Sequence, residues 1–174
     1  MRVMGTKFGV LVAGATVFGI AAQVGWLIMA GILDAAVGTD EPLPDDFWGS
    51  LLQTQARGVL LVVLAAVFGF GLTSIVRNTG AALGVGFVYF SIVETAIRIL
   101  KPTWEPFLLS SNAAGLVTPG GITVFVQDGA PGPDGLVHPT EYVVTNLQGA
   151  VLLGAVTAVV LAAGLVLFAR RDLH

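Results

Sequence analysis

Four long apolar stretches divide the chain, and short polar segments separate them. The apolar stretches cover residues 8–33, 58–76, 80–100 and 147–169. A helix needs about 20 mostly apolar residues to cross the ~30 Å hydrocarbon layer of a bilayer, because each residue adds about 1.5 Å. The pattern therefore predicts four transmembrane helices, an all-α polytopic membrane bundle, and one transmembrane domain that covers residues 1–174.

The first stretch also has features of a cleaved signal peptide, with Arg2 and Lys7 before it and the small residues Ala35 and Ala36 after it. The apolar core of a signal peptide is only about 7–15 residues long. The apolar stretch here is far longer, which favours a transmembrane helix.

The orientation follows from lysine and arginine residues, which accumulate in the cytoplasmic flanks of membrane spans. The flanks on one side carry five such residues, namely Arg2, Lys7, Arg77, Arg170 and Arg171. The other side carries Arg57 and Lys101, with Arg98 just inside the third span. This bias predicts that both termini are cytoplasmic and that Arg77, Arg170 and Arg171 anchor the inner face of the plasma membrane.

The connecting segments differ in length. Residues 77–79 leave room only for a tight cytoplasmic turn, so the second and third spans form an antiparallel hairpin. Residues 101–146 form a long external segment. Its first part, "PTWEPFLLSSNAAGLV", predicts one or two short helices along the outer membrane surface. Its second part, "TPGGITVFVQDGAPGPDGLVHPT", predicts an irregular loop because Gly and Pro flank its β-prone core.

Charged side chains inside a span are costly and therefore informative. Glu94 and Arg98 are four residues apart, so they share a helix face and form a candidate intramembrane ion pair. Glu94 lies about 9 Å deeper than the end of the stretch. One interpretation is that Glu94 faces a polar cavity or substrate path. The favoured one is a structural pair that locks the helix against its neighbours. Small residues predict close helix packing at Gly69, Gly71, Gly80 and Gly84.

The composition supports a membrane protein and excludes several functions. The chain is 55% hydrophobic and only 11% charged, and its mean hydropathy is +0.88. A net charge of −3 without a basic block argues against a nucleic-acid partner. No phosphate-binding loop, catalytic triad, cysteine or histidine cluster is present. The sequence therefore predicts no enzyme activity, no cofactor and no metal site in this chain.

Three segments of the sequence resemble those of a known protein family. They are "RVMGTKFGVLVAGATVFGIAAQ", the hairpin "SIVRNTGAALG", and the closing "LFARRDL" with Phe168, Arg170, Arg171 and Asp172. In their order and spacing they resemble the C-terminal part of a type-2 ABC transporter permease, the membrane subunit of a bacterial ABC exporter. The resemblance extends over nearly the whole chain from about Arg2.

The resemblance implies a permease subunit that forms part of a translocation path. It implies a separate ABC ATPase subunit as the energy source and a second permease copy or a paralogue as a partner. Arg2 and Lys7 are then candidates for the cytoplasmic contact, and Glu94 with Arg98 for a polar lock at the outer side. Family permeases usually have six spans, so the two that precede the lysine-bearing helix would come from an upstream start or a partner chain, or the chain is a remnant.

Two other functions fit the same residues. A non-transporting structural or accessory subunit of a larger membrane complex would also have four spans and an ordered external segment. A proton-coupled carrier would use Glu94 as its proton-binding group.

Overall fold

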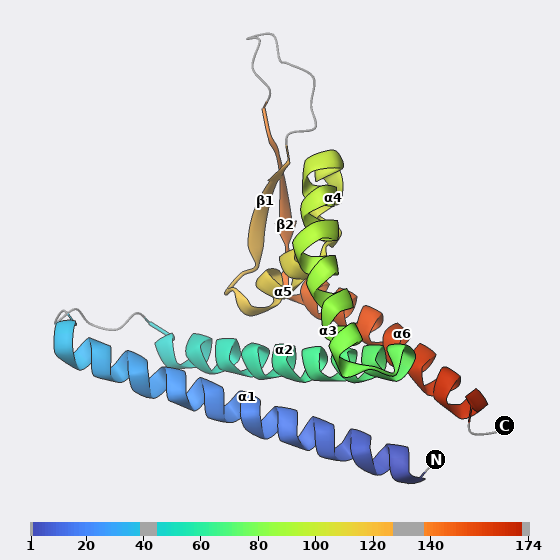
Figure 1. The fold of residues 1–174 in the computed structure, drawn as a ribbon. Coiled ribbons are helices and arrows are strands. Elements are labelled where there is room, and N and C mark those ends of the chain that lie inside the picture. Colours follow the sequence, from blue (N-terminus) through green and yellow to red (C-terminus); the bar gives the residue numbers. More distant parts are fainter. Residues whose placement is uncertain (1, 39–44, 127–137, 172–174) are drawn as a thin grey trace. The chain divides into compact units, whose positions relative to one another are not determined.

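The computed structural model of the protein describes residues 2–38, 45–126 and 138–171 (Figure 1). In this part of the chain the helices are α1 (Arg2–Val37), α2 (Phe47–Val76), α3 (Thr79–Val88), α4 (Glu94–Leu100), α5 (Leu109–Val117) and α6 (Asn146–Arg171). A π-helical turn, η1 (Tyr89–Val93), joins α3 to α4, and a 3-10 helix, η2 (Pro102–Phe107), precedes α5. The strands are β1 (Ile122–Val126) and β2 (Thr140–Val144).

Four helical segments of the described chain are long and apolar enough to span a membrane, as the hydropathy pattern predicts. They are Gly5–Val37, Phe47–Val76, Thr79–Leu100 and Asn146–Arg170. Most of their large apolar side chains are exposed, for example Phe18 and Leu83. Exposed apolar faces of this extent are stable only in an apolar solvent such as lipid. The chain is therefore a multi-pass membrane protein with predominantly helical structure.

The second helix starts well before its predicted span. We expect a span from residue 58, but α2 begins at Phe47. Hydropathy locates only the apolar part of a helix, whereas Gln53, Thr54 and Gln55 are polar residues that a helix accommodates without interruption. The first residue of α2 therefore lies about three helical turns before the start of the apolar stretch.

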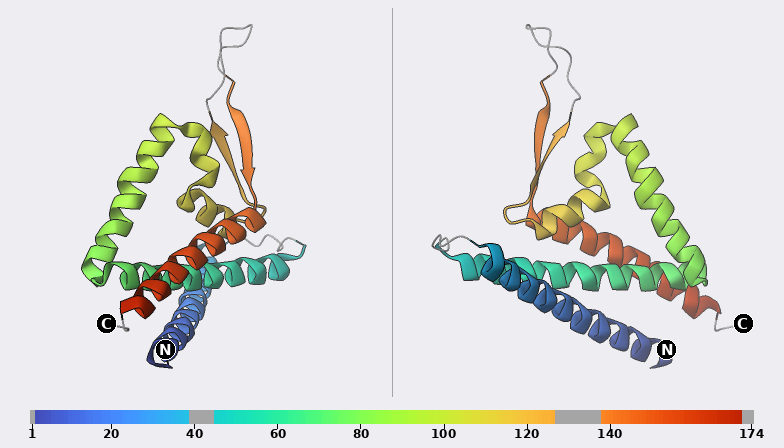
Figure 2. Two further views of the ribbon diagram at one scale, coloured as in Figure 1. Left: turned by 90° about the vertical axis from the view of Figure 1, so that its right-hand side faces the viewer. Right: turned by 60° about the vertical axis from the view of Figure 1, so that its left-hand side comes forward.

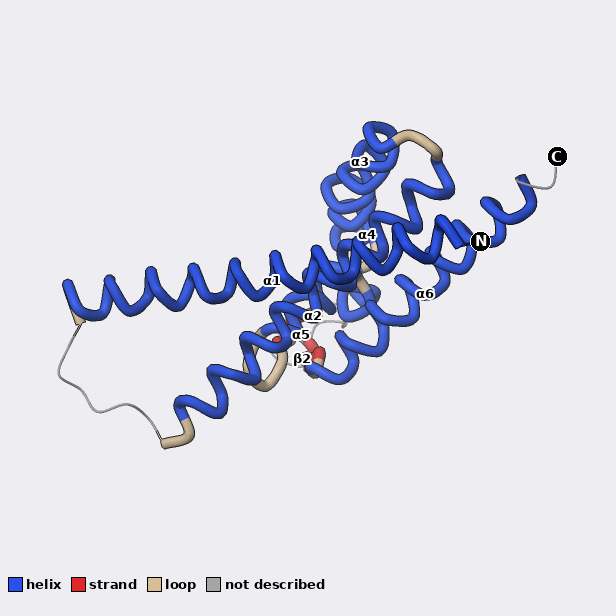
Figure 3. The backbone as a smooth tube through the Cα atoms, turned by 90° about the horizontal axis from the view of Figure 1, so that it is seen from below, coloured by secondary structure: helices blue, strands red, loops and turns tan. Residues whose placement is uncertain are grey.

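The chain divides into two compact units, Met1–Val67 and Phe68–His174. In the first unit α1 and α2 lie side by side and run in opposite directions (Figure 3). A Cβ atom at Gly19 would lie 3.5 Å from Val59 and Val62, and one at Gly58 would meet the side chain of Gln23. Small residues thus allow the two helices to approach closely.

A tight turn connects α2 to α3 in the second unit. Arg77 follows the last residue of α2 in the left-handed conformation, with φ 64°, and its N–H donates to the Thr73 carbonyl over 2.7 Å. The Asn78 side chain then accepts a hydrogen bond from the N–H of Ala81 over 3.1 Å and caps α3. The predicted tight turn between the second and third spans is therefore confirmed, with only two residues between the helices, whereas the antiparallel packing of these spans stays a prediction.

Two glycines set the packing of α6 on the C-terminal end of α2. A Cβ atom at Gly71 would lie 2.9 Å from the Leu161 nitrogen, and one at Gly164 would lie 2.8 Å from the Gly71 carbonyl oxygen. The expectation of close packing is correct for Gly71. It is wrong for Gly69 and Gly84, where a Cβ atom would meet nothing within 4 Å.

The prediction of an irregular loop over residues 118–140 is wrong for its apolar core. Ile122–Val126 forms β1, which pairs antiparallel with β2 in a two-stranded sheet (Figure 2). The buried side chains Val124, Val126 and Val144 form a small core with Ile122. Because both strands are five residues long, β1 depends on a partner that lies beyond a Gly- and Pro-rich stretch. The fold is therefore helical with one added hairpin rather than purely α.

We expect Gly71→Ala and Gly164→Ala each to destabilise the protein by about 1–3 kcal/mol, because a methyl group would force α2 and α6 apart. Gly154→Ala is the matched control on α6, since a Cβ atom there would meet nothing within 4 Å. Thermal unfolding in detergent measures the effect. Equal melting temperatures for Gly164→Ala and Gly154→Ala would contradict this packing.

Candidate functional site

The most deeply buried charged residue of the described chain lies in the third span. Glu94, the first residue of α4, is only 1% exposed. Burial of a carboxylate is costly unless donors surround it. Its surroundings therefore define the candidate site.

Glu94 supplies the N-terminal cap of a different helix. The N-cap position of α5 is Leu108, which has no side-chain acceptor. Oε1 of Glu94 instead accepts a hydrogen bond from the Ser110 N–H in the first turn of α5, over 3.2 Å. A carboxylate is favourable here because it satisfies a free N–H and faces the positive end of the helix dipole.

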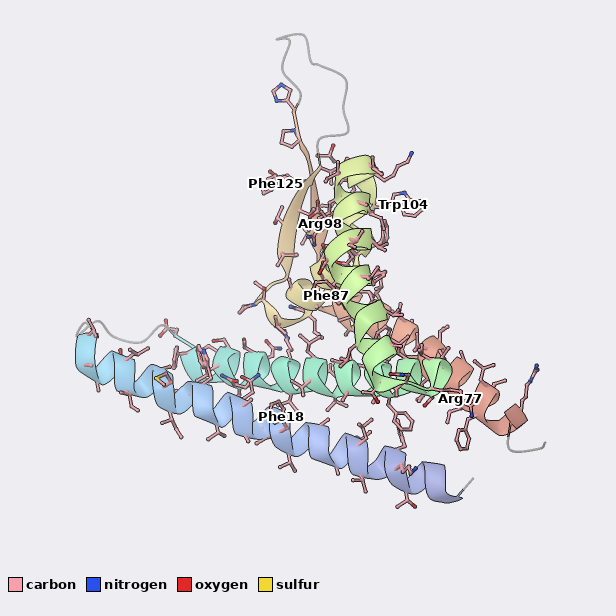
Figure 4. All side chains as sticks on the ribbon, viewed as in Figure 1. Phe18, Arg77, Phe87, Arg98, Trp104 and Phe125 are labelled. Carbon is pink, nitrogen blue, oxygen red and sulfur yellow. The ribbon has the colours of Figure 1, made fainter. Side chains whose placement is uncertain are left out.

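Arg98 binds the same region from one turn further along α4. Its Nη2 donates to Oγ of Ser110 over 2.6 Å, and its Nε lies 3.4 Å from Oε1 of Glu105 in η2. Figure 4 shows Arg98 on the side of α4 that faces the hairpin, whereas Trp104 points away from it. Arg98 thus connects α4 to both η2 and α5.

The predicted partners Glu94 and Arg98 share one face of the span, but Ser110 lies between them. Ser110 donates its backbone N–H to Glu94 and accepts from Arg98 through its hydroxyl. Among the described residues, the ion pair of Arg98 is with Glu105 rather than with Glu94. Glu105 comes from a separate element, η2, which spacing along one helix does not reveal.

Tyr89 is a member of this cluster that the sequence pattern does not reveal. Its hydroxyl interacts with the Glu94 carboxylate five residues ahead. In an α-helix, residues five apart point about 140° away from each other. The π-helical turn η1 removes this offset, since its hydrogen bond joins the Glu94 N–H to the Tyr89 carbonyl.

The other end of α5 is capped by α6. Nδ2 of Asn146 donates to the carbonyls of Gly115, Leu116 and Thr118, over 2.7, 3.1 and 2.7 Å. These are among the carbonyls that a helix C-terminus leaves without an internal partner. Sequence reasoning missed Asn146, because an Asn at the start of an apolar stretch predicts an N-terminal cap of its own helix, whereas this side chain caps the C-terminal end of α5.

Two side-chain amides also hold the end of η2 in place. Nδ2 of the buried Asn112 donates to the carbonyls of Pro106 and Leu108 over 2.9 and 2.8 Å. Nε2 of Gln148 reaches the same Pro106 carbonyl over 3.1 Å. The Pro106 carbonyl at the end of η2 thus has two side-chain donors, and the Leu108 carbonyl also accepts the backbone N–H of Asn112 over 3.0 Å.

The short helices predicted for residues 102–117 are confirmed as η2 and α5. The further expectation that they lie along the outer membrane surface stays a prediction. All nine residues of α5 are buried or half-buried, whereas Trp104 and Phe107 of η2 are exposed.

The remaining predicted residues lie at helix ends. Lys7 is exposed on the first turns of α1, Arg77 is exposed in the turn before α3, and Arg170 is exposed at the end of α6. The structure describes the helical backbone at Arg2 and Arg171, whereas their side chains lie outside the described part.

Within the described residues, no group of three or more His, Cys, Asp or Glu side chains is placed to hold a metal ion. Comparison of the chain with protein-family models, with curated proteins and with solved structures finds no match. The cluster around Glu94 is therefore interpreted from its own chemistry.

We expect Glu94→Ala to destabilise the protein by about 1–3 kcal/mol, because the buried Ser110 N–H would lose its acceptor. Glu94→Gln should cost less, since its amide oxygen can still accept that hydrogen bond. Glu141→Ala, at an exposed position of β2, is the control. Thermal unfolding in detergent measures all three. Equal effects of the Ala and Gln variants would show that Glu94 does not act through its acceptor oxygen.

Proposed function

We propose that this chain is a membrane-spanning permease subunit of an ABC-type exporter. It would form part of the translocation path, while a separate ABC ATPase subunit supplies energy and a second permease copy or a paralogue completes the path. The observation that carries this proposal is the order of the elements. A tight turn between α2 and α3 is followed by a folded segment between the third and fourth spans, and the last span ends at Arg170 and Arg171.

The proposed topology places both termini in the cytoplasm of the bacterial cell. The inner-face anchors are then Arg77, Arg170 and Arg171, and the segment of residues 101–146 is external. Support comes from the distribution of lysine and arginine, which resist transfer across the membrane.

Two sets of residues have separate roles in this proposal. Arg2 and Lys7 provide the cytoplasmic contact with the ATPase. Glu94 and Arg98 hold the external segment on the third span, with Ser110 as their common partner. A carboxylate that is already engaged by the Ser110 N–H and Tyr89 favours this holding role over that of a proton-binding group in a carrier.

A second candidate function is a structural or accessory subunit of a larger membrane complex. The observation that favours it is the packing of α5, which is capped at both ends by Glu94 and Asn146. A scaffold needs such a rigid segment, whereas a transport path also needs parts that move.

Purification of the tagged chain from its native host tests these two functions. For an exporter subunit, we expect the purified complex to hydrolyse ATP and to contain a P-loop ATPase. Lys7→Glu should weaken this association, because it reverses a charge at the proposed contact, and Lys101→Glu is the matched control on the opposite side. A stable complex without ATPase activity would favour the accessory function.

The same host tests the topology. The chain contains no cysteine, so a cysteine placed at His138 or at His174 is its only thiol. A membrane-impermeant maleimide should label position 138 in intact cells and position 174 only after permeabilisation. Labelling of position 174 from outside would reverse the proposed orientation.

A further inference from the structure

The third span contains one residue more than an uninterrupted α-helix would need. Its backbone is α-helical on both sides of η1, with φ and ψ of −60° and −43° at Val88 and of −65° and −39° at Glu94. Within η1 the hydrogen bond spans five residues instead of four, from the Glu94 N–H to the Tyr89 carbonyl. Such single π-helical turns are rare and occur frequently at functional sites.

The extra residue has a direct consequence for Tyr89. A π-helical turn stacks residues five apart, so it places the Tyr89 side chain over the Glu94 carboxylate. If the turn relaxed to α-helix with the same sequence, Tyr89 would point about 140° away from Glu94. The contact between these two residues therefore requires the π-helical turn.

The two halves of the span are held in different ways. On α4, Glu94 and Arg98 make polar contacts with α5 and η2, which a rotation of α4 would break. On α3, Leu83 and Phe87 are 71% and 70% exposed, while Ala82 is 5% exposed. Rotation of α3 would exchange one apolar face for another, at little cost in a solvent that is as apolar as leucine.

We propose that η1 is a rotary hinge in the third span, with the contact between Tyr89 and Glu94 as its latch. When Tyr89 leaves Glu94, the turn relaxes to α-helix and α3 rotates by about 100° relative to α4, the angle of one helical residue. Because α3 begins at Thr79, directly after the Arg77–Asn78 turn, the rotation transmits a change at the Glu94 cluster to the opposite end of the span. The hinge is independent of the exporter function.

Single spin labels on α3 test the rotation, since the chain has no native cysteine. Ala82 is only 5% exposed, and its neighbours Ala81 and Leu83 are both exposed. A rotation of about 100° in either direction therefore moves position 82 toward the lipid. The protein is reconstituted in phosphatidylcholine vesicles, and collisions with dissolved oxygen report the lipid exposure of labels at positions 82 and 83.

In the otherwise unchanged chain, we expect the label at position 83 to be much more accessible to oxygen than the label at position 82. Tyr89→Phe removes the hydroxyl and should abolish this contrast by raising accessibility at position 82. Tyr142→Phe, which changes the chain's other tyrosine, should leave it intact. An unchanged contrast in Tyr89→Phe would overturn the hinge.

Deletion of Ser91 separates the hinge from a general loss of packing. The deletion removes the extra residue, so an α-helix then brings Tyr89 within four residues of Glu94 and keeps both on one face. This chain should retain the contrast between positions 82 and 83, and Tyr89→Phe should no longer change it. A loss of contrast on Tyr89→Phe in the deletion background would show that the π-helical turn is not the moving part.

Discussion

Both ends of α5 depend on side chains from other elements, and the second unit is organised around this constraint. A helix that ends away from water must satisfy its free N–H and C=O groups. Glu94 does so at the N-terminal end and Asn146 at the C-terminal end. The hairpin then packs directly on α5, where a Cβ atom at Gly115 would lie 3.0 Å from the Val144 carbonyl oxygen. Two side chains, one from α4 and one from α6, thus fix the position of α5.

The sequence predicts the spans well because lipid imposes a strong and local requirement. An apolar stretch of about 20 residues stands out in the sequence without any information on distant contacts. All four predicted stretches are helical in the structure. The start of α2 at Phe47 was not predictable in this way, since polar residues continue a helix as readily as apolar ones. The pairing of Phe125 with Glu141 in the hairpin depends on distant residues, so local patterning identified only a β-prone core.

The candidate site shows the same division between local and distant information. Glu94 and Arg98 are visible in the sequence because charges in an apolar run are unusual. Their actual partners come from η2 and α5, and Tyr89 joins them through a π-helical turn that a period of 3.6 residues does not describe. A charged residue in a span is thus a reliable sign of a polar environment, but its spacing identifies only those partners that share its own helix.

The left-handed conformation of Arg77 has a cost in backbone energy. Any side chain other than glycine in this region costs about 1–2 kcal/mol of backbone strain, and glycine is the usual residue where an α-helix ends in this way. A glycine would relax the polypeptide but leave the turn between α2 and α3 without its guanidinium group. The turn therefore combines a less stable backbone conformation with an exposed positive charge.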